Sequence, residues 1–357
     1  MNRVKLAVAG AGLIGLEHIK RIEASSHTEL VAIVDPSERA VTIAEECGVR
    51  YFQTLNALIE ARCAEGIILA TPNRLHAEQT QACISAGLAT LIEKPVSHNL
   101  ESARDLLTFY ESTDQTVPVL VGHHRAYSSV MAAASDLVHT GRLGKLIAVQ
   151  GSALFYKPEH YFREGPWRSE AGGGPILLNL IHEIGNLRHL CGEIIEVYAK
   201  ASNAQRGFIV EDTCVVSITF ANGALGSFIL SDTAASPKSW EQTTAENPSY
   251  AHYPAESCYH LAGTQGSLSI PDMLLRHYPQ NVDPSWWNPF DEAFITYKPN
   301  DPLISQIESF AAVIRGKAQP KVSLVDGFNN LLVVEAISAS AKENRPIRIN
   351  LDLRNFS

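Results

Sequence analysis

A glycine-rich turn directly after the first predicted strand limits what this chain can fold into. Residues 4–9 form an uninterrupted apolar run, which is typical of a fully buried strand. The sequence Gly10-Ala11-Gly12-Leu13-Ile14-Gly15 follows at once, and a helical apolar pattern continues to residue 24. Glycines at this spacing allow a tight turn, close approach of the backbone to a pyrophosphate, and packing of the helix on the strand. The sequence therefore predicts a dinucleotide-binding turn.

A carboxylate ends the second predicted strand, residues 30–34. This residue, Asp35, lies about 20 residues beyond the last glycine, where a carboxylate can accept hydrogen bonds from the adenosine ribose and would repel a 2′-phosphate. Asp35 therefore favours NAD as the cofactor. Arg39 is near enough in the sequence to leave NADP open.

Predicted strands and helices alternate as far as residue 121. Helices are predicted over 37–47, 75–86 and 100–112, and strands over 67–70, 90–93 and 117–121. Strands that alternate with helices of about ten or more residues are typical of a parallel, doubly wound sheet. We therefore expect an NAD(P)-binding Rossmann domain over residues 1–122.

The predicted strand 90–93 ends in a charged pair and a proline, Glu93-Lys94-Pro95. Charged side chains are rarely buried unless they are paired or used. This strand belongs to the sheet that carries the glycine-rich turn, and open α/β sheets bind ligands at the carboxyl ends of their strands. Lys94 is therefore a candidate functional residue, although a solvated strand end would explain the same three residues.

From residue 196 onward the pattern changes to strands joined by short turns. Residues 215–220 and 224–230 predict a hairpin with a type I′ turn at Asn222-Gly223, and residues 259–262 with 267–270 predict a second tight pair. Further elements are expected as helices over 172–191, 301–315 and 325–342 and a last strand over 347–351. We expect residues 123–357 to form an α+β domain with a large, mostly antiparallel open sheet flanked by helices.

A loop in this second part combines aromatic and cationic side chains, among them Tyr156, Trp167 and Arg168. Aromatic faces stack on sugar rings, while arginine donates hydrogen bonds to sugar hydroxyls. A loop folded over its own small core would have a similar composition. The sequence leaves both interpretations open.

The predicted helix 172–191 carries His182 within a dense apolar pattern. A histidine on such a helix is usually a hydrogen-bonded core residue, but its ordinary pKa also suits a proton acceptor near neutral pH. Asn179 lies three residues earlier and hence on the same face of a helix. His182 is therefore a candidate catalytic residue with Asn179 as its neighbour.

No metal site is predicted. His182-Glu183 lacks the second histidine of an H-E-x-x-H motif, because Asn186 stands at that position. Adjacent His123 and His124 on an extended segment would point to opposite faces.

The composition argues against several classes of partner. A net charge of −9 without a basic run disfavours nucleic acid and anionic membrane surfaces. No segment reaches the ~20 apolar residues of a membrane span, and the N-terminal apolar run contains glycines and lacks a signal-peptide cleavage site. The six cysteines are scattered without disulfide-like spacing, so we expect a cytoplasmic protein.

Short motifs occur in a fixed order along nearly the whole chain. They are Gly10-Ala11-Gly12-Leu13-Ile14-Gly15, Ala70-Thr71-Pro72-Asn73 with His76, Glu93-Lys94-Pro95, Gly122-His123-His124-Arg125, Trp167-Arg168, Gly172-Gly173-Gly174, His182, Glu211-Asp212-Thr213, Asn222-Gly223-Ala224-Leu225-Gly226 and Gly263-Thr264-Gln265-Gly266-Ser267-Leu268. In this order they resemble the glucose–fructose oxidoreductase and inositol dehydrogenase family (Gfo/Idh/MocA). The resemblance implies an NAD(P)-dependent oxidoreductase that acts on CH–OH groups. It also implies that the second domain binds substrate and joins subunits into a homodimer or homotetramer through its sheet.

The resemblance further implies roles for individual residues, with Lys94 and His182 in the catalytic positions. The implied cofactor contacts are Gly10, Gly12, Leu13, Ile14, Gly15, Asp35, Thr71, Pro72, Asn73, His76, Glu93 and Lys94. The expected substrate contacts are Lys94, His124, Arg125, Tyr156, Trp167, Arg168, Asn179 and His182. One position departs from the pattern, because many members have an aspartate four residues before the catalytic histidine and this chain has Leu178. A leucine can neither orient an imidazole nor bind a hydroxyl.

Together the resemblance and these residues predict an NAD-dependent dehydrogenase, and the resemblance implies that it oxidises a secondary hydroxyl of a sugar, polyol or inositol-like compound. His182 would accept the hydroxyl proton and Lys94 would stabilise the alkoxide, or the two roles would be exchanged, since burial can lower a lysine pKa. Two alternatives keep the same fold: an NADPH-dependent ketosugar reductase and a non-catalytic regulator that senses the dinucleotide. Leu178 favours the regulator, whereas the presence of both Lys94 and His182 argues against it.

Overall fold

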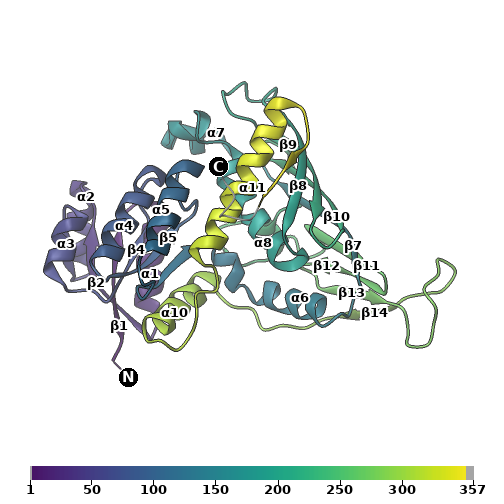
Figure 1. Ribbon diagram of the computed structural model, residues 1–357, viewed down its shortest axis with the longest axis horizontal. Coiled ribbons are helices and arrows are strands. Elements are labelled where there is room, and N and C mark those ends of the chain that lie inside the picture. Colours follow the sequence, from purple (N-terminus) through teal and green to yellow (C-terminus); the bar gives the residue numbers. More distant parts are fainter. Residues whose placement is uncertain (1, 351–357) are drawn as a thin grey trace. The chain divides into compact units, whose positions relative to one another are not determined.

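The computed structural model describes residues 2–350, which pack into two units (Figure 1). Unit 1 contains residues 2–127 and 301–331, and unit 2 contains residues 128–300 and 332–350. The first boundary lies close to the expected one at residue 122. The segment 301–331 differs from our expectation, because it packs with the first unit and not with the second.

Unit 1 is built on a sheet of six parallel strands in the order β3-β2-β1-β4-β5-β6. The strands are β1 (Val4–Ala9), β2 (Thr28–Val34), β3 (Arg50–Phe52), β4 (Gly66–Leu69), β5 (Ala89–Glu93) and β6 (Val119–Gly122). This is the order of a Rossmann sheet, in which the winding reverses between β1 and β4. The predicted doubly wound parallel sheet is confirmed.

Helices cover both faces of this sheet, which is why its strands are almost entirely apolar. The helices of unit 1 are α1 (Leu13–Ala24), α2 (Glu38–Glu46), α3 (Leu55–Ala61), α4 (His76–Ser85), α5 (Leu100–Ser112), α10 (Pro302–Ile314) and the first part of α11 (Leu324–Glu343). Leu6 and Val8 of β1 point into one core cluster, and Ala7 and Ala9 point into the other.

Helix α10 comes from far along the chain and completes the first of these clusters. Ile307 and Phe310 are fully buried there, among residues of β1 and α1. A Cβ placed on Gly66 of β4 would lie 3.0 Å from the Phe310 ring, so helix and strand pack without room for a side chain. The expected domain division was therefore incomplete, because the apolar face of a helix does not reveal which sheet it covers.

Unit 2 contains a nine-stranded sheet in the order β14-β13-β12-β11-β7-β10-β9-β8-β15. Its strands are β7 (Leu146–Leu154), β8 (Ile194–Ser202), β9 (Thr213–Phe220), β10 (Leu225–Ser231), β11 (Tyr259–Gly263), β12 (Gly266–Ile270), β13 (Leu274–His277), β14 (Asp291–Phe294) and β15 (Ile347–Arg348). All neighbours pair antiparallel except β7 and β10, which are parallel. The predicted mostly antiparallel sheet is confirmed.

The sheet of unit 2 has one covered and one open face, since buried and exposed residues alternate along β9. The helices of this unit are α6 (Ser129–His139), α7 (Glu159–Glu164), α8 (Ile181–Cys191), α9 (Trp240–Thr243) and the last part of α11. In Figure 1, α6 and α8 lie together beside the strands. Across residues 2–350, no helix is long and apolar enough to cross a membrane.

The turn between β9 and β10 differs from the predicted type I′ turn. Among the two central residues only Gly223 has a positive φ, of +87°. The N–H of Gly223 donates to the carbonyl of Phe220, and the N–H of Phe220 donates to the carbonyl of Ala224, both at 3.0 Å. This is a three-residue loop with glycine in the left-handed position, the next most common hairpin connection after the two-residue one.

Two further elements begin or end differently from the prediction. The helix expected over 172–191 starts as a π-helical turn, Ile176–Leu180, which leads into α8. Gly172 and Gly174 stay outside it with φ of +89° and +83°. The last strand, expected over 347–351, is observed as Ile347–Arg348, and Leu351 lies outside the described residues.

Candidate functional site

The glycine-rich turn lies at the carboxyl end of β1, against the loop that follows β4. Gly10 has a φ of +92°, and a Cβ on it would lie 2.4 Å from the carbonyl oxygen of Ala70. A Cβ on Gly15 would lie 1.8 Å from the carbonyl oxygen of Gly10, whereas one on Gly12 would meet nothing within 4 Å. The first and third glycines are thus required by packing, and the second leaves open space at the start of α1. Open space at a helix N-terminus fits a pyrophosphate.

Asp35 follows β2, and its carboxylate organises the neighbouring main chain. One oxygen accepts a hydrogen bond from the N–H of Ala11 and the other from the N–H of Ser37, both at 2.8 Å. Burial alone would raise the pKa of Asp35, but these hydrogen bonds hold it below its ordinary value. The side chain is therefore an anion beside the glycine-rich turn. Such a site fits ribose hydroxyls and disfavours a 2′-phosphate.

The loop after β4 carries four predicted cofactor residues, of which His76 has an indirect role. His76 is buried, and its two ring nitrogens lie 2.8 Å from the carbonyl oxygens of Thr71 and Pro95. The imidazole therefore connects the loop after β4 to the loop after β5, and its expected role is to hold these two loops in position. Pro72 and Asn73 form the start of a 3-10 turn, Asn73–Leu75.

Glu93 and Lys94 end β5 beside a histidine from α1. His18 is 0% exposed, and its Nε2 lies 2.7 Å from Oε1 of Glu93, which is 5% exposed. The second oxygen of Glu93 accepts a hydrogen bond from the main-chain N–H of Lys94 at 3.2 Å. Burial would raise the pKa of Glu93, but the contact with His18 and the charge of Lys94 hold it below its ordinary value. Glu93 thus turns inward to His18 and holds the backbone of Lys94, which is half-buried and precedes a cis peptide bond.

Sequence reasoning did not single out His18. The available signal was a histidine on the apolar face of α1, between Gly15 and Ile22, where the neighbouring residues are buried. A polar residue on such a face needs a partner. The partner itself is distant in the sequence, so only the fold identifies it as Glu93.

His124 and Arg125 follow β6 in a 3-10 turn, His124–Tyr127. Burial, together with the charge of Arg125, lowers the pKa of His124 to about 3, so its ring is neutral at physiological pH. Glu93 and Lys94 also act electrostatically on His124. These groups therefore form one polar cluster at the carboxyl ends of β5 and β6, which are neighbouring strands.

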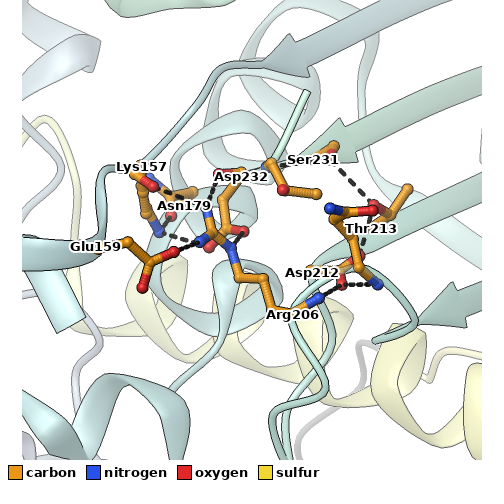
Figure 2. A network of polar contacts seen from close by, with 10 residues as sticks. Lys157, Glu159, Asn179, Arg206, Asp212, Thr213, Ser231 and Asp232 are labelled. Atoms are coloured by element: carbon orange, nitrogen blue, oxygen red, sulfur yellow. Dashed lines mark hydrogen bonds and ion pairs between the residues drawn. The ribbon is translucent and has the colours of Figure 1, made fainter. Parts of the chain in front are cut away.

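The predicted residues of unit 2 gather around α8 and the loop after β7. His182 is buried in the first turn of α8, and Asn179 is half-buried in the π-helical turn before it. The ammonium group of Lys157 donates to Oδ1 of Asn179 at 2.7 Å and lies 3.4 Å from a carboxylate oxygen of Asp232 (Figure 2). The other oxygen of Asp232 accepts from Nε of Arg206 at 2.9 Å. Sequence reasoning missed Lys157, Arg206 and Asp232.

The aromatic loop of unit 2 has both an inner core and exposed faces. Phe162 is buried, with the guanidinium of Arg206 4.6 Å from its ring centre. Tyr156 and Trp167 expose about half of their surfaces, and the guanidinium of Arg168 lies 3.9 Å from the ring centre of Tyr161. The loop is thus folded over a small core, and it also keeps aromatic surface available for a ligand.

The structure groups the site residues within each unit. In unit 1 the glycine-rich turn, Asp35, the Thr71 loop and Lys94 share the carboxyl edge of one sheet. In unit 2 Asn179 and Lys157 are in direct contact near His182. The described part of the chain contains no group of three or more His, Cys, Asp or Glu side chains that could hold a metal ion.

Comparisons with known proteins agree with this fold. The family model described as an oxidoreductase family with an NAD-binding Rossmann fold matches residues 4–123, and the GFO/IDH/MocA C-terminal domain matches residues 131–269. Among solved structures, the WlbA dehydrogenase of Bordetella pertussis, in complex with NADH and UDP-GlcNAcA, has a TM-score of 0.78 at 22% identity, covering 98% of this chain and 100% of that chain.

Two curated relatives match along nearly the whole chain. The chain is 26% identical to a 1,5-anhydro-D-fructose reductase of Ensifer adhaerens, over 99% of this chain and 100% of that protein. It is 24% identical to an inositol 2-dehydrogenase of Rhizobium meliloti (strain 1021), over 97% of this chain and 99% of that protein. With both family domains matched in order and the dinucleotide turn in place, the chain belongs to the Gfo/Idh/MocA family of NAD(P)-dependent oxidoreductases.

Proposed function

We propose that this protein is a dehydrogenase that uses NAD to oxidise a secondary hydroxyl of a sugar, polyol or inositol-like compound. The observation that carries the proposal is the grouping of the glycine-rich turn, the anionic Asp35 and Lys94 at one sheet edge. The relatives support the substrate class, since several of them are named inositol 2-dehydrogenase.

Three side chains carry the chemistry in this proposal. NAD, when bound, accepts the hydride from the substrate carbon. Lys94 donates a hydrogen bond to the reacting oxygen and stabilises its alkoxide character. Glu93, held by His18, fixes the main chain at Lys94. His182 accepts the hydroxyl proton, a task that suits the ordinary pKa of histidine.

A reductase that uses NADPH on a ketosugar is the second candidate. It is favoured by the relative named 1,5-anhydro-D-fructose reductase. Asp35 argues against it, because its carboxylate repels a 2′-phosphate. Comparing kcat/KM for NADH and NADPH with the same keto substrate decides between the two candidates.

We further propose that the protein forms a homodimer or homotetramer in the cytoplasm, through the open face of the unit 2 sheet. This face carries the exposed apolar side chains Ile147, Val215, Leu225 and Ile229, and a shallow hollow of about 550 Å³ crosses it. Exposed apolar surface of this kind is typical of an interface. All six cysteines are free, which fits a reducing compartment. Light scattering of the purified protein measures the subunit number.

The Lys94→Ala variant tests the proposed function. We expect turnover to fall by roughly 10²–10⁴-fold, because alkoxide stabilisation is lost, while the Kd for NADH stays within a few-fold. The matched control is Lys20→Ala, which removes a lysine from the same unit whose exposed side chain pairs only with surface Glu17 among the described residues. Turnover of Lys94→Ala close to that of Lys20→Ala would contradict the assignment. A wild-type protein that binds NADH but neither oxidises a polyol nor reduces a ketosugar would support the regulator.

A further inference from the structure

The contact between Lys157 and Asn179 fixes which end of the Asn179 amide is available. An ammonium group has hydrogen-bond donors and no acceptor, so the amide oxygen of Asn179 must face it. The distance of 2.7 Å is that of a charge-assisted hydrogen bond (Figure 2). The amide nitrogen, with its two N–H donors, therefore points away from Lys157.

Lys157 is itself held in place, so the orientation of the amide is stable. Its side chain is 11% exposed and lies 3.4 Å from Asp232, whose other oxygen accepts from Arg206. The guanidinium of Arg206 also donates to the carbonyl oxygens of Lys157 and Asp232, at 2.8 and 2.6 Å. Arg206 thus fixes the backbone of Lys157, and Lys157 in turn fixes the orientation of the Asn179 amide.

Asn179 lies within one helical turn of His182, the candidate proton acceptor, because the two residues are three positions apart on one helical run. Within residues 2–350, the amide nitrogen of half-buried Asn179 donates no hydrogen bond. An N–H₂ group that is partly buried and still available is suited to a ligand oxygen. The π-helical turn that carries it is a feature often found at functional sites.

We propose that Asn179 makes this protein select a sugar or polyol acid, whose carboxylate accepts a hydrogen bond from the Asn179 amide. The inference rests on the proposed function and adds the substrate class. An aspartate near the histidine offers acceptors alone, so it requires a substrate hydroxyl and repels a carboxylate. The pinned amide offers donors alone, and donors bind a carboxylate more strongly than a hydroxyl. Lys157 acts through Asn179 and is a positioning residue.

The test compares matched acidic and neutral substrates. The probes are D-glucuronate against D-glucose and D-galacturonate against D-galactose, with NADH formation as the assay. For the wild type we expect kcat/KM to be about tenfold or more higher for the acid of each pair. In Asn179→Asp the preference should reverse, since a carboxylate replaces the donors. In Lys157→Met the Asn179 amide is free to flip and present its oxygen to the substrate. The ratio of kcat/KM for the acid to kcat/KM for the neutral sugar should therefore fall toward one. Lys298→Met, on the exposed surface of the same unit, should keep the wild-type ratio.

Two outcomes separate failure of this inference from failure of the proposed function. If the wild type oxidises these compounds but Asn179→Asp keeps the same acid-to-neutral ratio, the selectivity is overturned and the dehydrogenase stands. If neither these four sugars nor a panel of polyols and inositols is oxidised, the proposed function falls, and calorimetric titration of the NADH-loaded protein still decides the inference. Tighter binding of D-glucuronate by the wild type than by folded Asn179→Asp supports it, and equal binding overturns it.

Discussion

Removing the imidazole of His18 should weaken both the Rossmann unit and catalysis. In the wild type this ring meets Glu93 at 2.7 Å, in a place where neither side chain is accessible to bulk water. The His18→Ala variant leaves a buried carboxylate that keeps the N–H of Lys94 at 3.2 Å but loses its closest partner. We therefore expect a less stable unit 1 and a less well fixed Lys94.

The structure sets the size of this effect. A hydrogen bond to a charged group contributes about 1.5–3 kcal/mol, and breaking a buried pair by removing one partner costs about 3–5 kcal/mol. Because the ring is lost from a fully buried position, it also leaves a cavity, and we expect the free energy of unfolding to fall by about 3–5 kcal/mol. In a His18→Ala/Glu93→Gln double variant the uncompensated charge is gone, so about 1–3 kcal/mol of that loss should be recovered.

The effect should also depend on pH. The folded protein holds the pKa of Glu93 below its ordinary value of 4.5. The contribution of Glu93 is therefore complete above that value and is lost as the pH falls through the lower folded pKa. In His18→Ala the effect of burial dominates and raises the pKa of Glu93. Protonation of the Glu93 carboxylate at low pH therefore removes the uncompensated charge and stabilises the variant. The difference in unfolding free energy between wild type and variant should narrow as the pH falls below 4.5.

Urea unfolding followed by two signals measures the effect in the correct unit. All four tryptophans lie in unit 2, so their fluorescence reports unit 2, while far-ultraviolet circular dichroism reports both units. We expect His18→Ala to shift the dichroism transition and lower kcat while leaving the fluorescence midpoint near that of the wild type. His27→Ala, an exposed histidine of the same unit, should stay within about 0.5 kcal/mol of the wild type. A loss below about 1 kcal/mol in His18→Ala would refute the buried pair as a stabilising element.

Two further substitutions test other parts of unit 1. Gly12→Ala should keep the unfolding free energy within about 1 kcal/mol of wild type, since a Cβ at this position meets nothing within 4 Å. The variant should nevertheless bind NADH tenfold or more weakly in a fluorescence titration, because the methyl group occupies space that the pyrophosphate needs. Unchanged affinity would contradict the dinucleotide turn. Phe310→Ala should destabilise unit 1 by about 3–5 kcal/mol, because the ring is fully buried in the Rossmann core. A loss seen in the tryptophan signal alone would instead assign α10 to the core of unit 2.

Elements whose signals are local could be predicted closely from the sequence. Helix α5 has the predicted bounds, because Asn99 caps its first turn by accepting from the N–H of Ser102 and its apolar face follows the helical period. Strand β1 and helix α1 also have the predicted bounds, since the glycine-rich turn separates them sharply. The alternation of strands and helices predicted a parallel, doubly wound sheet, and the strand order within it came only from the structure.

The elements that were predicted less well depend on contacts between distant residues. The sequence predicts a helix near residues 301–315, but only the close approach of Phe310 to Gly66 assigns it to the Rossmann sheet. His18 likewise shows no local sign of its partner, because Glu93 is 75 residues away. The motif residues could be proposed from the sequence because their spacing is local, whereas residues that contact them from distant segments, such as His18 and Lys157, could not.

The meaning of Leu178, before the candidate catalytic helix, also depends on a contact between distant residues, and the structure changes its interpretation. From the sequence, a leucine in place of an aspartate reads as a lost polar group beside His182, which favoured a regulator without turnover. In the structure the polar group of this turn is Asn179, and its oxygen is occupied by Lys157, which lies 22 residues earlier. A sequence supplies the amide but not the direction in which it points, because that direction depends on a cation from another loop. If Asn179 faces the substrate, as we propose, the departure reverses the hydrogen-bonding polarity of the site, and the chain remains an enzyme for a different class of polyhydroxy compound.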